Sequence, residues 1–317
     1  MMFSSISQER SSLNMKDFLG FTRRNLLIYF KDVLAIIFSL LTSIIVFVLY
    51  LLFLKGTFVE ALNSTMRGLE NIVSSADVEM FVNGILLSGI LGSALITIPY
   101  TCLQTIVKDK EAGVDADICS TPLKRWKIIL SYFTASSICA FIMTSIILTI
   151  GLVILNAMGD MHLGIAQIAA AYGIVLLGSV SSTALFMVIM LLFKNSSTST
   201  AFFGILTAAA GFVIGAYIPL SQFSDGVQSF CNLFPASHIT SMIRNILLSG
   251  ITDSINSDIN GLDGGAFISA IKDTFSFNAH SFGLDFTMQS SVIYIAVIAL
   301  VCIVAMTVAY NKTYRRK

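Results

Sequence analysis

Six long stretches of the chain contain no charged side chain and no histidine, and they constrain the fold more than any other feature. A helix needs about 20 mostly apolar residues to cross the roughly 30 Å hydrocarbon core of a bilayer. Each stretch is long enough, so we predict an all-α membrane protein with six transmembrane helices in a single domain. The predicted membrane helices cover residues 33–54, 84–107, 128–155, 165–193, 201–220 and 291–310.

The composition agrees with this prediction and argues against several soluble classes. Hydrophobic residues make up 56% of the 317 residues and charged residues only 12%, whereas a soluble domain has about 25% charged residues. A net charge of +1 provides no basic surface for a nucleic acid. The composition therefore argues against a cytosolic enzyme, a disordered protein and a nucleic-acid-binding protein.

Lysine and arginine are unequally distributed over the segments between the predicted helices. If the N-terminus lies inside, the inner segments hold fifteen of these residues and the outer segments hold four. Inner loops of membrane proteins are enriched in Lys and Arg. We therefore expect a multi-pass protein of a bacterial plasma membrane with both termini in the cytoplasm.

The ionisable residues form no pattern of a catalytic or metal site. The five cysteines include no Cys-x-x-Cys pair, and no second ligand accompanies His162, His238 or His280 at a suitable spacing. The Gly-rich phosphate-binding pattern that ends in Lys-Ser/Thr is missing as well. Charge-free membrane helices also argue against proton pumps and voltage sensors. We expect no metal, no cofactor and no catalysis in this chain itself.

Residues 12–32 predict an amphipathic helix before the first membrane helix. Apolar side chains recur at helical spacing from Met15 through Tyr29, while Arg23, Arg24 and Lys31 fall largely off that stripe. Such a helix lies in the headgroup region of a membrane, with its cations near anionic lipid. It is either a membrane anchor or a lever that couples a cytoplasmic partner to the first span.

The inner loop 108–127 carries charges of both signs. Gly113 permits a tight turn, and Pro122 marks a second boundary. A plain solvated loop would obey the positive-inside rule, but that rule does not account for acidic residues such as Glu111 and Asp117. A short helix of mixed charge is typical of a surface that docks another protein.

Uncharged polar and small residues concentrate in the second and fifth predicted membrane helices. In the second, an interior proline, Pro99, is expected to kink the helix. Its polar neighbours are Thr97, Tyr100, Thr101 and Gln104. In the fifth, Gly211 and Gly215 form a Gly-x-x-x-Gly pair that permits close approach of two helices. These residues either pack within one bundle or line a pathway or a subunit interface.

Residues 221–290 form an outer segment that is too long for a plain connection. Starting at Ser237 as N-cap, the pattern predicts a helix of about 12 residues, which is too short to span a bilayer. We therefore predict an outer re-entrant or interfacial hairpin that contains Pro235, His238 and Arg244. The predicted apolar face consists of Ile239, Met242, Ile243, Ile246 and Leu247. The polar residues 251–290 are expected outside, in water.

The order of these motifs resembles the membrane (permease) subunit of an ABC transporter, of the type-2 exporter permease superfamily. The resemblance rests on the basic helix from Phe21 to Asp32, on the loop from Asp109 to Trp126, and on the segment from Phe234 through Arg244 to Gly250. Each motif is weak alone, whereas their order and spacing together are specific.

The resemblance implies a role for each segment. The N-terminal helix would be a connecting helix, with Arg23, Arg24, Tyr29 and Lys31, and the outer segment would be the re-entrant hairpin. The inner loop would be a coupling helix that docks a separate ATP-binding subunit. Its implied contact residues are Glu111, Gly113, Asp117, Pro122, Lys124, Arg125 and Trp126.

The implied function is ATP-driven export by alternating access. Two copies of an ATP-binding subunit would bind ATP and Mg²⁺, and a second permease chain, identical or related, would complete the pathway within the membrane lipids. Because the predicted helices are uncharged, we expect an amphipathic or lipid-like cargo, such as a drug, antibiotic, peptide or lipid. The alternative is a secondary carrier or channel that works without a nucleotide.

Overall fold

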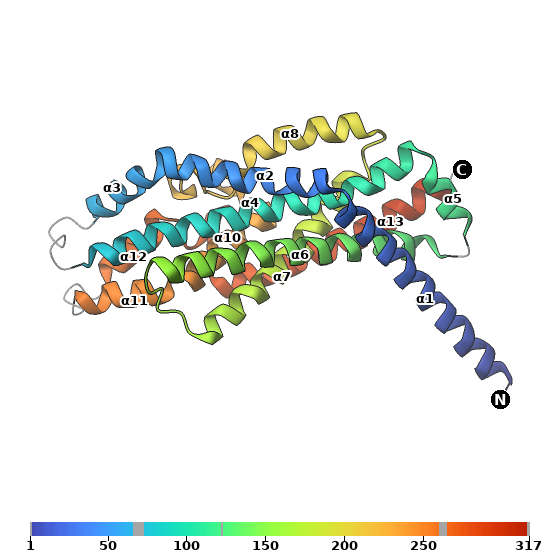
Figure 1. Cartoon of the computed structure of the whole chain (residues 1–317), viewed down its shortest axis with the longest axis horizontal. Helices are drawn as coiled ribbons and strands as arrows, with labels where there is room; N and C mark the ends of the chain where they lie inside the picture. Colours follow the sequence, from blue (N-terminus) through green and yellow to red (C-terminus); the bar gives the residue numbers. More distant parts are fainter. Residues whose placement is uncertain (1, 66–72, 122, 260–264, 316–317) are drawn as a thin grey trace.

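The central element of the structure is one long helix, α4 (Ser75–Glu111), which packs against helices on several sides. The computed structural model describes residues 2–65, 73–121, 123–259 and 265–315. Apart from the N-terminal helix, its long helices run side by side and form an elongated bundle (Figure 1). The helices that contact α4 most extensively are α2 (Val33–Leu49), α6 (Arg125–Met158), α7 (Ile165–Met190), α8 (Ser196–Val213) and α10 (Pro235–Leu247).

Five helices in the described part of the chain are long and apolar enough to cross a membrane. They are α4, α6, α7, α8 and α13 (Met288–Arg315). A sixth span results only if Met15–Lys31 of α1 (Met2–Lys31) and α2 are counted together across a bend of 73°. Asp32 forms this bend and accepts a hydrogen bond from the Ala35 amide at 3.0 Å. Each of these five helices overlaps one of the six predicted spans.

The helix that begins at Val33 continues beyond the predicted end at Leu54. A π-helical turn, η1 (Tyr50–Leu54), leads directly into α3 (Lys55–Thr65). The prediction ended there because Lys55 is charged, but Lys55 Nζ lies 3.5 Å from Glu79 Oε1 of α4. Tyr50 and Phe58 are both buried, with ring centroids 6.0 Å apart. The continuation therefore packs on the bundle.

The fifth predicted span, 201–220, has wrong boundaries. The helix α8 covers Ser196–Val213, and Gly215 takes up the left-handed conformation with φ 66°. That conformation is easily adopted by glycine and ends a helix. The apolar run to Leu220 contained no sign of this turn other than the glycine itself.

The outer segment is folded and has a core of its own, which the expectation of a polar stretch 251–290 in water did not include. It contains the buried side chains of Ile251, Ile255 and Ile271. The rings of Phe275 and Phe277 pack on the ring of Phe81 in α4, with centroids 5.3 and 6.1 Å away. The segment's elements are η2 (Leu220–Gln222), α9 (Asp225–Cys231), α10, α11 (Ser249–Asp258), α12 (Ala266–Thr274), β1 (Ala279–Ser281) and β2 (Leu284–Phe286). The two strands pair antiparallel, with Ala279 opposite Phe286. Because polar residues separate the apolar ones, the composition concealed this core.

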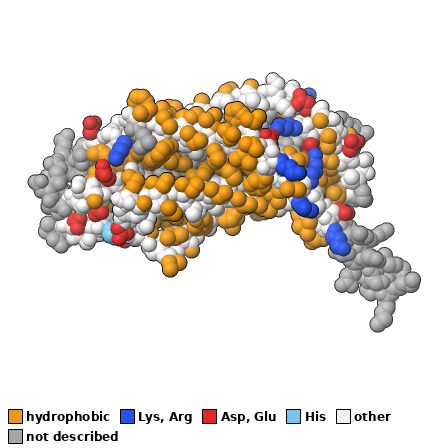
Figure 2. All heavy atoms as spheres, viewed as in Figure 1, with side chains coloured by type: hydrophobic (Ala, Val, Ile, Leu, Met, Phe, Trp, Pro, Cys, Tyr) orange, Lys and Arg blue, Asp and Glu red, His pale blue; other side chains and the backbone are white. Residues whose placement is uncertain are grey.

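The ends of the bundle differ in charge. The start of the chain, α5 (Val114–Ser120) and the end of α13 lie at one end, while α3, α11 and α12 lie at the other (Figure 1). Figure 2 shows a broad hydrophobic band between them, with Lys and Arg gathered at the end of α1 and α5. Large apolar side chains are exposed on the long helices, including Ile293 and Leu300 of α13, at 64% and 63%. A soluble monomer rarely exposes so much apolar surface, and the chain is a multi-pass integral membrane protein.

Candidate functional site

The connection between α4 and α6 forms a short helix on the end of the bundle. Gly113, with φ 75°, reverses the chain after α4, and α5 follows from Val114. Ile118 and Cys119 of α5 pack against the core, and Cys119 Sγ lies 3.7 Å from Tyr310 Oη of α13. None of the α5 residues is fully buried, and Asp117 is exposed. One face of α5 is thus held by the bundle and the other is free to contact a partner.

The residues that lead into α6 also reach the surface. Lys124 is the exposed N-cap residue, Arg125 begins the helix, and Trp126 is 42% exposed. Lys127 Nζ lies over the Trp126 ring at 5.5 Å from its centroid, an attractive cation–π geometry. Pro122, another predicted docking residue, lies outside the described residues. The structure therefore presents an exposed carboxylate, cations and an indole at the end of the bundle that carries α5.

Glu111 has a structural partner in addition to its predicted docking role. Its Oε2 accepts a hydrogen bond from the Ser196 amide at 3.0 Å, at the first residue of α8. A carboxylate at a helix N-terminus satisfies a free amide and suits the helix dipole. The neighbouring Lys110 Nζ donates to the Leu191 carbonyl at 3.4 Å. The end of α4 is thereby connected to the turn between α7 and α8.

Arg24, which was predicted to lie near the lipid headgroups, pairs with a carboxylate of α4. Its Nη1 and Nη2 bond Asp109 Oδ2 and Oδ1 of α4 at 2.7 and 2.9 Å. Asp109 is only 8% exposed and also accepts a hydrogen bond from Tyr132 Oη of α6. The sequence could not reveal this pair, because 85 residues separate its members. Through Asp109, this ion pair joins α1, α4 and α6.

The rest of α1 follows the same division between a bundle side and a free side. Tyr29 is 3% exposed and its hydroxyl lies 3.0 Å from Ser39 Oγ. Thr22 Oγ1 lies 2.7 Å from Ser131 Oγ of α6. Arg23 and Lys31 are exposed, as are the apolar Met15 and Leu19. Part of the predicted apolar stripe therefore points away from the bundle.

The polar residues predicted on the second span are packed inside the bundle rather than around an opening. Thr97 Oγ1 donates to the Ser39 carbonyl at 2.8 Å, and Thr101 Oγ1 donates to the Thr97 carbonyl at the same distance. Tyr100 Oη donates to the Ser199 carbonyl of α8, also at 2.8 Å. All three are buried, and α4 continues through Pro99 as one helix. Gln104 alone is half-buried, beside a cavity of about 20 Å³.

Among the described residues, the glycine pair of the fifth span lies closest to the turn that follows α8. Gly211 accommodates the ring of Tyr217, which lies 2.2 Å from where a Cβ would stand. Its carbonyl accepts hydrogen bonds from the Ala216 and Tyr217 amides at 2.8 and 3.2 Å. Gly215 lies beyond the end of α8. Both glycines shape the turn, and their role at a pathway or a subunit interface stays a prediction.

Helix α10 is inserted against α4 and α7, and its predicted apolar face is confirmed. Ile239, Ile243 and Leu247 are each 0% exposed. The helix begins at Pro235, so Ser237 is not the N-cap. Proline suits the first position of a helix because no intrahelical acceptor awaits its missing N–H.

His238 of α10 is a buried histidine that hydrogen-bonds through both ring nitrogens. Nε2 lies 3.0 Å from the Asn232 carbonyl and Nδ1 lies 3.1 Å from Ser291 Oγ. Since a carbonyl only accepts, Nε2 carries the proton and Nδ1 accepts from the serine. Burial lowers the pKa of His238 from 6.5 to about 4. The ring is thus neutral and joins α10 to the start of α13.

Arg244 is also buried, at 1% exposure, and no carboxylate among the described residues contacts it. Nη2 donates to the Gly215 carbonyl at 2.7 Å, Nη1 to the Phe275 carbonyl at 2.8 Å, and Nε to Ser88 Oγ at 3.2 Å. Desolvation by burial lowers its pKa from 12.5 to about 10. Arg244 therefore joins four segments of the outer end through neutral acceptors.

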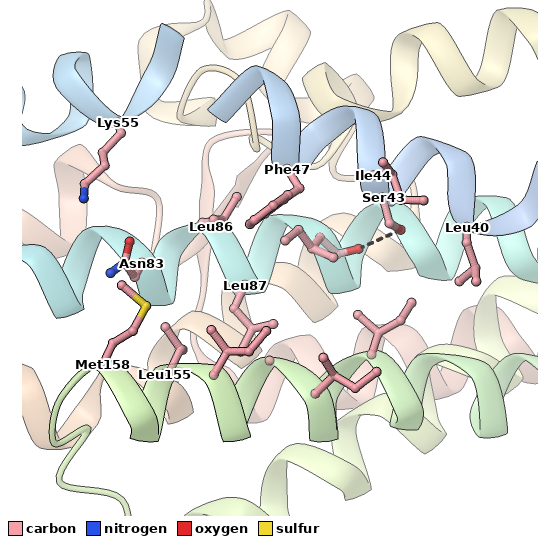
Figure 3. A pocket seen from close by; sticks show the side chains of 15 residues that line it. Leu40, Ser43, Ile44, Phe47, Lys55, Asn83, Leu86, Leu87, Leu155 and Met158 are labelled. Carbon is pink, nitrogen blue, oxygen red and sulfur yellow. Dashed lines mark hydrogen bonds between the residues drawn. The ribbon is translucent and has the colours of Figure 1, made fainter. Parts of the chain in front are cut away.

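The structure opens a cavity at a place that the sequence did not indicate. Its volume is about 420 Å³, and it lies between α2, α4 and α6 (Figure 3). None of the residues predicted for a pathway lines it. Within the described ranges, no group of His, Cys, Asp or Glu side chains is arranged to hold a metal ion.

Comparison with known proteins identifies the family of this arrangement. The model of the ABC-2 family transporter proteins matches residues 59–309, from α3 into α13, which is more than half of the chain. No curated protein matches the chain. The chain therefore belongs to the ABC-2 family of transporter proteins and is a membrane (permease) subunit of this type, as the order of its sequence motifs had predicted.

Proposed function

We propose that this permease subunit works in an ATP-driven ABC exporter and that a separate ATP-binding subunit docks on α5. The observation that carries this proposal is α5 itself, a short helix fastened to the bundle on one side and exposed on the other. Asp117 and Trp126 offer a charge and a large aromatic surface there. Interfaces draw much of their binding energy from such aromatic anchors.

The contacts behind α5 provide a route for force from the docked subunit. A displacement of α5 acts on the end of α4 through Gly113, on α1 through Asp109 and Arg24, and on α8 through Glu111 and Ser196. Coupling between two sites requires such contiguous, stiff contacts. On this proposal, α1, α4 and α8 move together when the ATP-binding subunits close.

The assembly follows from the same proposal. Two ATP-binding subunits bind ATP and Mg²⁺, and two permease chains enclose the path. The basic end with both chain termini faces the cytoplasm, in agreement with the gathering of Lys and Arg in Figure 2. An amphipathic or lipid-like cargo fits the charge-free membrane helices. No reaction takes place in the permease chain, which contributes the path.

The test is co-expression of the chain with candidate ATP-binding subunits, followed by reconstitution of the complex in nanodiscs. The double variant Trp126→Ala/Asp117→Asn should lose about tenfold in ATP turnover or in affinity for the ATPase, equivalent to about 1.4 kcal/mol at the interface. Phe282→Ala is the matched control, because Phe282 is 75% exposed outside the predicted docking loop.

The outcomes separate the alternatives. Unchanged turnover and co-purification of the double variant would contradict docking at α5. Transport by the chain alone, independent of nucleotide, would instead support a secondary carrier or channel.

A further inference from the structure

The cavity between α2, α4 and α6 is apolar along most of its length and polar at one end. Figure 3 shows Lys55, Asn83 and Met158 at that end, and Leu40 and Ser43 at the other. Most of the remaining lining consists of aliphatic side chains of α4 and α6. A volume of about 420 Å³ lies within the range of roughly 300–1,000 Å³ that is usual for small-molecule sites.

The polar groups of the cavity differ in whether they have partners. Ser43 Oγ lies 3.3 Å from Ser93 Oγ. In contrast, Nδ2 of Asn83 has no hydrogen-bond partner among the described residues, although Asn83 is only 7% exposed. A buried amide left unpaired costs about 1–3 kcal/mol. Among the described residues, the Asn83 amide nitrogen therefore lacks an acceptor at the polar end of the cavity.

Charge at the polar end is of both signs. Lys55 Nζ lies 3.5 Å from Glu79 Oε1, and Glu79 stands one helical turn before Asn83 on α4. The Lys55 ammonium and the Asn83 amide are both donors. A phosphate or ester group placed there would accept from both, while the apolar walls exclude a ligand that is polar throughout.

The cavity opens sideways, toward the surface that faces lipid. Ile150, Ile154 and Met158 of α6, which form its rim, are 55%, 52% and 59% exposed. From Ile147 to Met158 the helix rises about 16 Å at 1.5 Å per residue. That length matches one leaflet's half of the roughly 30 Å hydrocarbon core.

We propose that this groove binds one glycerophospholipid of the surrounding bilayer, with an acyl chain along α6 and its phosphate–ester region at Asn83 and Lys55. The inference goes beyond the proposed function, since it concerns a resident lipid rather than the cargo. The other lipids around the protein exchange without preference, whereas this lipid is held by the donors of Asn83 and Lys55 and by the apolar wall of the groove. It also satisfies the Asn83 amide.

The experiment is native mass spectrometry of the delipidated full-length chain in detergent, titrated with dioleoylphosphatidylglycerol and dioleoylphosphatidylethanolamine. The unaltered chain should bind one phospholipid at a concentration well below that of further adducts. Asn83→Leu and Lys55→Gln should each weaken the first binding step about tenfold. Asn278→Leu and Lys272→Gln, which alter an exposed asparagine and a partly exposed lysine outside the groove, should leave it unchanged.

A second measurement places the lipid without disturbing the polar end. In a Trp126→Phe background, phospholipids with brominated chains should quench the tryptophan fluorescence of Ile154→Trp at lower mole fractions than that of Val301→Trp. Val301, on α13, is 60% exposed. Asn83→Leu should abolish that difference.

Equal quenching at the two positions, or a first adduct that is insensitive to Asn83 and Lys55, would overturn the proposal. Retention of detergent alone would overturn it too. Neither result bears on docking at α5, so the two proposals fail separately.

Discussion

Arg24 and Asp109 form a two-point ion pair, in which Nη1 meets Oδ2 at 2.7 Å and Nη2 meets Oδ1 at 2.9 Å. The pair connects the N-terminal helix to the last turn of α4, just before Gly113 turns the chain into α5. Planar, two-point geometry of this kind is specific to arginine. Any displacement of α5 relative to α1 must strain or break it.

Neutralising Asp109 should destabilise the permease. Asp109→Asn removes the charge that pairs with Arg24 and leaves one oxygen to accept hydrogen bonds from both Arg24 and Tyr132. We expect a loss of about 1–3 kcal/mol, the range for hydrogen bonds to charged groups, measured by thermal unfolding in detergent. Asp117→Asn, an exposed carboxylate on α5, is the control and should have no effect. Equal stability of the two variants would show that the pair contributes nothing.

The same pair can be tested by a double-mutant cycle. Arg24→Met combined with Asp109→Asn should cost less than the sum of the single changes, because each single change leaves the other partner uncompensated. Strict additivity would contradict a direct interaction.

Replacing Arg244 should be the most damaging single change at the outer end. Arg244→Met removes the donors for the Gly215 and Phe275 carbonyls, and each buried acceptor left unpaired costs about 1–3 kcal/mol. Arg244→Lys should recover little, since a single ammonium cannot reach acceptors on several segments. Ser88→Ala, which removes one acceptor, should cost only about 1 kcal/mol. Thermal unfolding followed by size-exclusion chromatography would rank the stabilities of the three variants. An Arg244→Met variant as stable as the unaltered chain would refute the structural role of Arg244.

Stability should fall on acidification because of His238. Its pKa is lowered to about 4 in the folded chain from 6.5, so the unfolded chain binds more protons between these values. The free energy of unfolding therefore rises with pH across this window, and on acidification the loss reaches about 3 kcal/mol by pH 4. In His238→Gln this part of the pH dependence should vanish. Parallel curves for both proteins would exclude His238 as its origin.

The glycines of α8 should respond oppositely to alanine. Gly211→Ala places a Cβ 2.2 Å from the Tyr217 ring, whereas a Cβ on Gly204 has no neighbour within 4 Å. We expect Gly211→Ala to cost about 1–3 kcal/mol by overpacking and Gly204→Ala to gain up to about 1 kcal/mol through helix propensity. Adding Tyr217→Ala should relieve much of the first loss. Similar melting temperatures for the two single variants would contradict this packing.

Membrane helices were predictable because their signal is local. Twenty apolar residues without a charge identify a span wherever the chain goes, and residues from Ile165 onward show this directly, since α7 begins there as predicted. The amphipathic face of α10 was equally local, and its isoleucines are buried. The order of the motifs sufficed for the family, because the family match covers residues 59–309.

Features that depend on distant partners were not predictable. The charge of Lys55 predicted the end of a span, but in the structure Lys55 pairs with Glu79. The position of Arg24 predicted a contact with lipid headgroups, but in the structure Arg24 pairs with Asp109. The spacing of Gly215 predicted a packing motif, but in the structure Gly215 lies in a turn and its carbonyl accepts a hydrogen bond from Arg244. In each case one residue type allows several environments, and burial selects among them.

The sequence alone determined that this chain is a membrane protein, where most of its long apolar helices lie and which family it resembles, because these properties depend on local hydrophobic length and on the order of motifs along the chain. Tertiary structure decided which charges are used internally, where the cavity opens and which surface α5 leaves free. Those properties arise when helices far apart in sequence pack together, since a buried polar group must then find a partner or remain, like the Asn83 amide, without one.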